Sequence, residues 1–232
     1  MKHILLIALF ALLHSGVYGQ GRNRKFLEVA THSRYQLGWY TLEDGTRHAG
    51  KLRMWQTLEQ NSVQVDQGKA DPINLLPEQL RCFTMGADSF IIARHVAVAG
   101  MPDIKPFSEV DIYRVVLKGR LQVFAHDCII RGGHTNMPGA AGMPGMVMSN
   151  GPSHVRSWVL RPTSDANLVM MPYDKEAFAH HVAPFFVRDP ILTQYIRAGM
   201  VDYHDFERIV YAYIFYKDIN QVTYEQAAVL FR

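Results

Sequence analysis

The stretch 38–55 constrains the fold most, because it has the pattern of two strands joined by a tight turn. Asp44-Gly45 interrupts an aromatic and apolar run. An Asp-Gly pair supplies the positive φ angles that a tight hairpin turn needs, and apolar residues at alternate positions give each arm one buried face. We therefore predict a β-hairpin, with Trp39 and Leu52 as candidates for the core.

Further strand and turn signals follow along the chain as far as residue 172. Regular spacing of this kind favours an antiparallel meander that curls into a barrel or sandwich. We expect one antiparallel β domain over residues 38–172. Its predicted later strands are 62–66, 81–85, 89–98, 111–117, 121–124, 157–160 and 168–171.

From residue 173 the hydrophobic period becomes that of a helix. Asp174, Asp189 and Asp202 stand where a helix N-cap is favoured, and Thr223 with Gln226 forms a capping box. We expect a short C-terminal helical region over residues 173–232 that packs on the sheet. The predicted fold class is therefore α+β: an antiparallel, barrel-like or meander β-sheet followed by a short C-terminal helical region.

The N-terminus is typical of a secretory signal peptide. Lys2 precedes an uncharged run over residues 4–13, and Val17 and Gly19 fit the −3 and −1 positions of a small-residue cleavage site. The apolar run is shorter than the roughly twenty residues of a membrane span. We expect a signal peptide over residues 1–19, a secreted or periplasmic location and no transmembrane segment after cleavage; an uncleaved anchor is the alternative.

The charge balance argues against nucleic acid as a partner. The chain has 24 Lys and Arg residues against 21 Asp and Glu residues, a formal net charge of +3 at pH 7. Nonspecific nucleic-acid binding needs a basic face that so weak a charge does not build. A basic cluster at Arg22, Arg24 and Lys25 falls in residues 20–37, where we expect a loose N-terminal arm, with a short strand as the alternative.

Two cysteines, Cys82 and Cys128, lie in apolar strand-like runs. Export would permit a disulfide, while a free cysteine in such a run also behaves as a small buried hydrophobe. The sequence leaves both possibilities open. On a strand His126 would share a face with Cys128 and suggest a Cys–His pair, but we interpret Cys128 as a core residue.

Residues 131–154 differ from the rest of the β domain in being rich in glycine, proline and methionine. We expect a long mobile loop inserted in the sheet. Thioether and imidazole groups are ligands that suit Cu(I), so the loop is a candidate copper site; the alternative is that methionine is adaptable filler that rests on a partner surface. The candidate metal ligands are His134, Met137, Met143, Met146, Met148 and His154.

Histidines in the helical region suggest a second, weaker metal site. His180 and His181 could meet His204 together with Asp202 or Asp205. Neighbouring helical residues point about 100° apart, so we expect one histidine of the adjacent pair to pack and the other to face solvent.

Four stretches, 38–52, 76–83, 115–124 and 178–213, together resemble an uncharacterised family of secreted proteins from Bacteroidota, common in Hymenobacter-like genomes. The resemblance implies export and brings no established activity, cofactor or catalytic residue. Family members usually have a short connection where this chain has 131–154. A weaker resemblance, to the Sm-type barrel, lies in the spacing of Leu42, Gly45, Gly50 and Leu52, which suits a strongly bent hairpin.

The sequence holds no Gly-x-Ser-x-Gly elbow, His-Glu-x-x-His, Cys-x-x-Cys, P-loop or dinucleotide fingerprint. We therefore assign no catalytic residue and no cofactor. The expected function is that of an exported, non-catalytic protein that binds a protein or cell-envelope partner. The alternatives are a hydrolase or metal-dependent enzyme with an unrecognised site, and a copper-handling protein that uses the methionine-rich loop.

Overall fold

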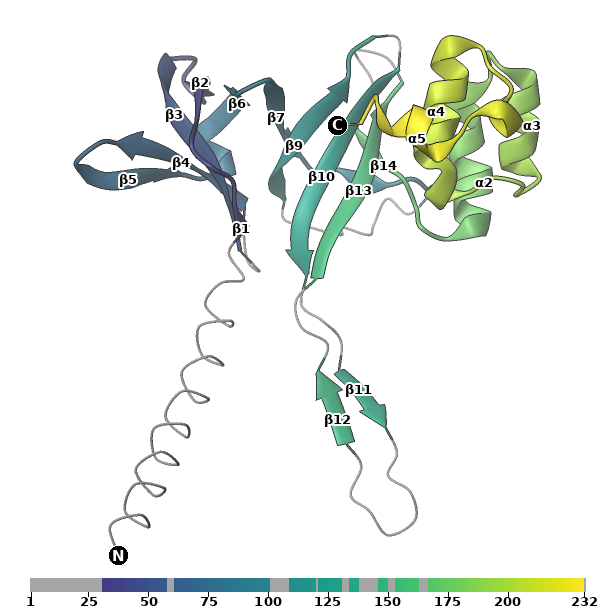
Figure 1. Cartoon of the computed structure of the whole chain (residues 1–232), viewed down its shortest axis with the longest axis horizontal. Coiled ribbons are helices and arrows are strands. Elements are labelled where there is room, and N and C mark those ends of the chain that lie inside the picture. Colours follow the sequence, from purple (N-terminus) through teal and green to yellow (C-terminus); the bar gives the residue numbers. More distant parts are fainter. Residues whose placement is uncertain are drawn as a thin grey trace, which may run out of the picture.

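A large, mostly antiparallel sheet followed by a small helical region makes up the described part of the protein, so the predicted α+β class is confirmed (Figure 1). In Figure 1 the helices pack at one end of the sheet and strands β2–β5 lie at the other. The computed structural model describes residues 31–57, 61–100, 109–119, 121–130, 134–137, 146–149, 153–162 and 167–231.

The predicted hairpin opens the sheet. It consists of β2 (Gln36–Leu42) and β3 (Arg47–Gln56). At its turn, Gly45 has a φ of 92°, and the Asp44 carboxylate accepts hydrogen bonds from the backbone N–H of Thr46 at 2.8 Å and from its hydroxyl at 2.6 Å. The Asp-Gly pair therefore makes the turn that the sequence predicts.

The chain then adds strands on both sides of this hairpin. Strand β4 (Asn61–Gln67) pairs with β3, and β5 (Ala70–Leu75) pairs with β4. A single 3₁₀ turn, η1 (Pro77–Gln79), brings the chain back so that β6 (Leu80–Met85) pairs with β2. Strands β5, β4, β3, β2 and β6 lie side by side in this order and contribute to a cluster of buried apolar side chains. Its members are Leu52, Val63, Val65, Leu75, Leu80, Phe83, Met85, Phe90 and Ile112.

The second half of the sheet continues from β6 and ends in a parallel pair. The order is β6-β7-β9-β10-β13-β14-β8, in which only β14 and β8 are parallel. His95 has a φ of 53°, so the predicted strand 89–98 is broken into β7 and β8. The bounds are β7 (Asp88–Arg94), β8 (Ala97–Val98), β9 (Val110–Leu117), β10 (Gln122–Ile130), β13 (Ser153–Arg161) and β14 (Val169–Met170).

The helical region begins at its predicted caps. The Asp174 carboxylate accepts from the N–H of Ala177 at 2.8 Å, and that of Asp189 from the N–H of Leu192 at 2.9 Å. The capping box of Thr223 is also present. The elements are α2 (Lys175–Val182), η2 (Ala183–Phe186), α3 (Pro190–Arg197), η3 (Tyr203–Asp205), α4 (Phe206–Phe215), η4 (Ile219–Gln221) and α5 (Tyr224–Ala228).

The helices pack on the sheet as expected. Trp158 on β13 stacks on Phe206 of α4, with ring centroids 5.5 Å apart, and meets the edge of Phe231 at 5.0 Å. All three side chains belong to one buried cluster. Within the part of the chain that the structure describes, no helix has both the length and the apolar character needed to cross a membrane.

Two segments differ from expectation. In the arm predicted over 20–37, β1 (Thr31–His32) pairs with the end of β3, and β2 begins at Gln36; residues 1–30, with the cleavage site, lie outside the described residues. In the loop predicted over 131–154, β11 (His134–Met137) pairs with β12 (Met146–Ser149), and β13 begins at Ser153. These two runs contain no glycine or proline, so they can form a ladder that the composition of the whole stretch conceals.

The two cysteines do not form a disulfide. Cys82 lies on β6 and Cys128 on β10, and both are free. Strands β7 and β9 separate them, which at about 4.8 Å per strand gives roughly 14 Å. A disulfide needs Cα atoms within about 7 Å, so this sheet excludes the bridge that the sequence left open.

Candidate binding groove

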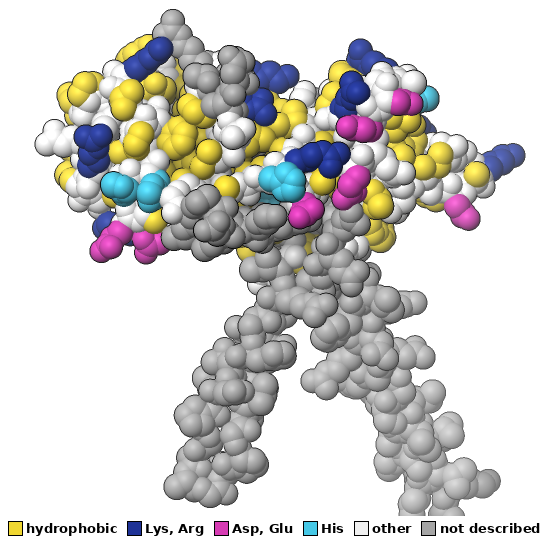
Figure 2. Space-filling view, turned by 180° about the vertical axis from the view of Figure 1, so that it is seen from behind, with side chains coloured by type: hydrophobic (Ala, Val, Ile, Leu, Met, Phe, Trp, Pro, Cys, Tyr) yellow, Lys and Arg dark blue, Asp and Glu magenta, His cyan; other side chains and the backbone are white. Residues whose placement is uncertain are grey.

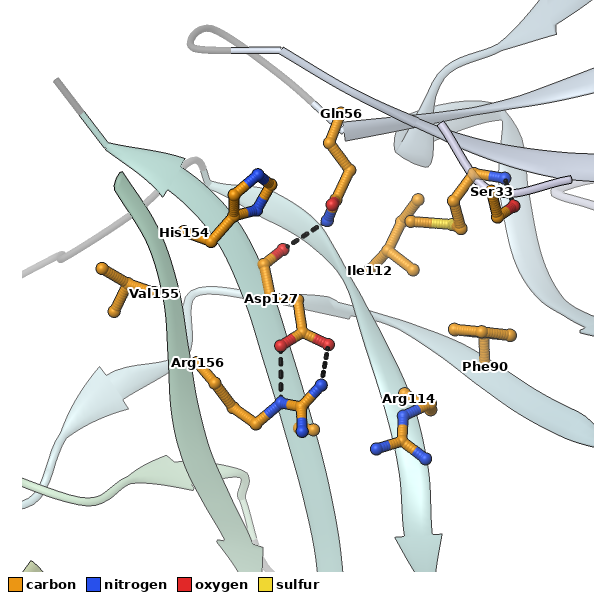
Figure 3. A pocket seen from close by; sticks show the side chains of 11 residues that line it. Ser33, Gln56, Phe90, Ile112, Arg114, Asp127, His154, Val155 and Arg156 are labelled. Carbon is orange, nitrogen blue, oxygen red and sulfur yellow. Dashed lines mark hydrogen bonds and ion pairs between the residues drawn. The ribbon is translucent and has the colours of Figure 1, made fainter. Parts of the chain in front are cut away.

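A groove with a volume of about 540 Å³ lies on one face of the sheet (Figure 3). Its size falls in the range of roughly 300–1,000 Å³ that is usual for ligand sites. Residues of β3 line one side, and residues of β7, β9, β10 and β13 line the rest. They are Ser33, Met54, Gln56, Phe90, Ile112, Arg114, Ala125, Asp127, His154, Val155 and Arg156.

Strand register places most of the charged side chains of the groove on one face. Arg114 lies opposite Ala125, and Asp127 opposite Arg156. Since residues two apart on a strand share a face, Ala125 and Asp127 point to the same side. Trp158, the partner of Ala125 on β13, packs against the helices. The groove therefore shares its face with the helical layer.

The lining combines an apolar floor with a polar rim. Met54, Phe90, Ile112 and Ala125 form the apolar floor, and the rim carries hydroxyl, amide, carboxylate, imidazole and guanidinium groups. Val155 lies opposite Cys128 in the strand register, so its side chain points to the other face of the sheet from Arg156. Ligand sites usually join apolar contact area with a few polar groups that fix orientation. The groove has both.

An ion pair stands at the rim. Arg156 Nε lies 2.6 Å from Asp127 Oδ1, and its Nη2 donates to Oδ2 at 3.2 Å (Figure 3). This hydrogen bonding raises the pKa of Arg156, against the effect of partial burial. Partial burial also raises the pKa of Glu207, and the positive charge of Arg156 opposes that rise. Both members of the pair are partly exposed, so their charges remain within reach of a ligand.

Two side-chain amides hold the two walls of the groove together. Gln56 Nε2 donates to the main-chain oxygen of Asp127 at 2.8 Å, and Asn61 Nδ2 lies 3.3 Å from the same oxygen. Gln56 and Asn61 are paired where β3 passes into β4. Figure 3 shows the Gln56 side chain reaching across to β10. These bonds fix the spacing between β3 and β10, so the groove is formed before any ligand arrives.

Arg114 connects the groove to the helical region. Its Nη2 donates to the main-chain oxygen of Phe231 at 3.2 Å, and its Nη1 lies 3.6 Å from Asp88 Oδ1. The central strand β9 is therefore tied to residues far from it in sequence.

A second polar cluster lies on the other face of β9 and β10. His126 is fully buried, and its Nε2 is 2.8 Å from Asp111 Oδ2. Asp111 Oδ1 accepts from Asn61 Nδ2 at 2.9 Å and from the N–H of Ile112 at 2.8 Å. Burial alone would raise the pKa of Asp111, but the hydrogen bond and charge of His126, with these two donors, lower it.

The buried cluster does not activate the neighbouring thiol. Cys128 shares a strand face with His126, as the sequence suggests. Burial first, and then the charges of Asp111 and Asp127, raise the pKa of Cys128 to about 11. The thiolate is the nucleophilic form, so the thiol is held in its less reactive form. This supports the interpretation of Cys128 as a core residue.

The predicted copper ligands fall in two places. Strand register sets Met137 opposite Met146, and Met148 opposite Thr135. His134 lies at the other end of this ribbon, opposite Ser149. His154 instead lines the groove, and Met143 lies outside the described residues.

The second predicted metal site is not supported. His180 is exposed and His181 partly buried, as their angular separation on a helix predicts, with ring centroids 4.6 Å apart. They line a hollow together with Glu176 and Arg197, and His204 is not part of its lining. Over the residues described here, no group of three or more His, Cys, Asp and Glu side chains could hold a metal ion.

Sequence reasoning missed Gln56, Arg114, Asp127 and Arg156 as groove residues. A usable signal exists for Arg114 and Asp127, which are charged residues within largely apolar strands. Figure 2 views the molecule from behind the view of Figure 1; there acidic and basic side chains are interspersed with hydrophobic ones over the coloured surface. Comparison with protein-family models, curated proteins and solved structures finds no significant match.

Proposed function

We propose that this protein is an exported, non-catalytic binding protein, and that the groove takes an extended segment of a protein or cell-envelope partner. The observation that carries the proposal is the forked Arg156–Asp127 pair at the rim of an apolar floor. An apolar side chain of the partner would occupy the floor. Polar groups beside it would exchange hydrogen bonds with the pair.

Preorganisation supports binding at this site. The amides of Gln56 and Asn61 already hold β3 against β10. A ligand therefore loses little free energy to ordering the groove, which favours affinity. Export rests on the signal peptide predicted over residues 1–19 and is part of the same proposal.

The enzyme alternative has less support. Its best polar cluster, Asp111 with His126, is buried, and the thiol beside it has a raised pKa. A general base must come within hydrogen-bond reach of its substrate, and a fully buried imidazole offers no such approach.

The copper alternative is supported by one specific observation, which is that Met137 lies opposite Met146 in the strand register. Competition with a Cu(I) chelator tests it directly.

The experiment that tests the groove is site-specific photo-crosslinking in the native cell envelope. A photoreactive phenylalanine at His154, which is exposed and lines the groove, should capture a discrete partner. The matched control carries the same group at Val229, which is 63% exposed on the helical region. Capture of the same species at both positions, or of nothing at His154, would count against the groove.

A substitution then links capture to the groove floor. Met54→Arg places a charge on the apolar floor, whereas Val229→Arg introduces the same charge outside the groove. Loss of a floor contact should weaken partner binding by about 1 kcal/mol or more, roughly fivefold. Equal binding by the two variants, both folded by thermal melting, would reject the groove as the partner site.

A further inference from the structure

A second cavity, of about 200 Å³, lies between the turn that follows β9 and the helical layer. Its walls are apolar: Leu117 and Leu121 come from either side of the turn, and Tyr213 and Ile214 come from α4. Leu121 is buried, and the other three pack against the same hydrophobic core. The cavity is therefore an opening into the edge of the packed core.

The mouth of the cavity carries two cations. Lys118 and Arg188 both line it and both are exposed. Neither forms an ion pair with any side chain in the ranges that the structure describes. The acidic residue of the lining, Asp189, caps α3 by accepting the N–H of Leu192 at 2.9 Å. The mouth therefore has an excess of positive charge.

An aromatic side chain completes the rim. Tyr216 ends α4 in the left-handed region, with a φ of 52°, and lines the cavity while remaining 85% exposed. A large exposed ring beside an apolar opening is more typical of a contact surface than of an isolated surface residue.

We infer that this cavity binds a small amphipathic carboxylate, with its apolar tail between β9 and α4 and its carboxylate between Lys118 and Arg188. The apolar walls select the tail, and the two cations select a negative head over a neutral or positive one. A volume of about 200 Å³ is below the usual range for drug-sized ligands of roughly 300–1,000 Å³. The tail is therefore short. This site is separate from the groove and does not rest on the proposed function.

The test is an NMR titration of the full ¹⁵N-labelled protein with three probes. Octanoate has both tail and charge, 1-octanol has the tail alone, and acetate has the charge alone. Octanoate should bind saturably and shift amides near Lys118, Arg188 and Tyr216. Octanol should bind at least about tenfold more weakly, and acetate should give no saturable response.

Substitutions assign the roles of the residues. Lys118→Gln and Arg188→Gln should each weaken octanoate binding about threefold or more, consistent with loss of one exposed charge interaction. Lys51→Gln, a change at a 62% exposed lysine on β3, is the matched control and should leave binding unchanged. All three positions are exposed, so the variants should fold; thermal melting checks this.

Several outcomes would overturn the inference. These are no octanoate binding, equal affinity for octanoate and octanol, or unchanged affinity in both cavity variants. Binding to phosphatidylglycerol vesicles without a response to octanoate would assign the cations to a lipid surface instead. Because the probes and variants do not involve Met54 or His154, failure here leaves the groove experiments unaffected, and the reverse also holds.

Discussion

The Asp111 carboxylate lies 2.8 Å from the His126 imidazole in a part of the sheet where His126 is fully buried. Asn61, at the start of β4, donates to the same carboxylate and also reaches the main chain of β10. One polar cluster therefore joins β4, β9 and β10. Because burying such groups is unfavourable unless they are bonded to one another, the cluster specifies how these strands meet.

Removal of the Asp111 carboxylate should destabilise the fold. We expect Asp111→Ala to lower the free energy of unfolding by about 3 kcal/mol, because it leaves buried donors without their acceptor. Asp127→Ala is the matched control: its carboxylate forms a partly exposed ion pair with Arg156, which is worth less than about 1 kcal/mol. Urea unfolding at pH 7 measures both. Equal losses of unfolding free energy in the two variants would show that the buried Asp111 carboxylate stabilises the fold no more than the exposed ion pair does.

The same carboxylate should make stability depend on pH. The pKa of Asp111 is lowered in the folded state, so its charged form stabilises the fold above its unfolded pKa of about 3.9. This stabilisation is lost as the pH falls through the lower folded value. We expect the free energy of unfolding to decrease below about pH 4, and to decrease less steeply in Asp111→Asn. Urea midpoints of both proteins between pH 7 and pH 3 test this. The prediction is contradicted if the midpoints of wild type and Asp111→Asn fall equally steeply below about pH 4.

Two paired glycines should differ in their tolerance of a side chain. Gly38 and Gly50 are opposite one another on β2 and β3. A Cβ at Gly38 would overlap the carbonyl oxygen of Thr84, whereas a Cβ at Gly50 would lie 3.4 Å from a Val65 methyl group. Gly38→Ala should therefore lower the free energy of unfolding by more than about 2 kcal/mol, and Gly50→Ala by less than about 1 kcal/mol. Thermal melting of the two variants decides; similar melting temperatures would refute the close approach of β2 to β6.

Tyr216→Gly should stabilise the protein. Tyr216 has a φ of 52° and a ψ of 44°, a left-handed conformation that is unfavourable by about 1–2 kcal/mol for L-residues other than glycine. Because its side chain is 85% exposed, little burial is lost, and we expect a gain of about 1 kcal/mol. Phe215→Gly, one residue earlier and within α4, should instead destabilise it by at least about 1 kcal/mol. A lower melting temperature for Tyr216→Gly would contradict the assigned conformation.

The thiols should react at different rates. Cys82 is partly exposed, whereas Cys128 is buried and its pKa is raised to about 11. In the native protein at pH 8 an alkylating reagent should modify Cys82 first, because the thiolate is the reactive form. Mass analysis after timed labelling follows this, and unfolded protein should show two free thiols. No free thiol after unfolding without reductant would indicate a disulfide.

Local signals in the sequence predict much of the fold. Asp44-Gly45 makes its turn, and Asp174, Asp189 and Thr223 cap their helices, because each of these interactions joins residues at most a few positions apart. The resemblance to secreted proteins of Bacteroidota concerns the same local patterns and stays a prediction.

The groove could not be predicted in the same way. It depends on β3 meeting β10, and Gln56 is 71 residues from the oxygen that it binds. The parallel pairing of β14 with β8 is also non-local, and neither two-residue strand has a pattern long enough to identify it. Similarly, nothing near His95 in the sequence marks the positive φ that ends β7.

The register of β10 and β13 has a consequence for how such a protein can diversify. The two strands stay paired from Gln122 opposite Arg161 as far as Ile130 opposite Ser153. The chain therefore leaves the sheet and re-enters it at neighbouring points. Because loop-closure entropy changes slowly with length, residues 131–152 can be shortened, lengthened or exchanged while both anchor points keep their places. Different segments can therefore be inserted between β10 and β13, and the strands that line the groove and carry the helical layer keep their pairing.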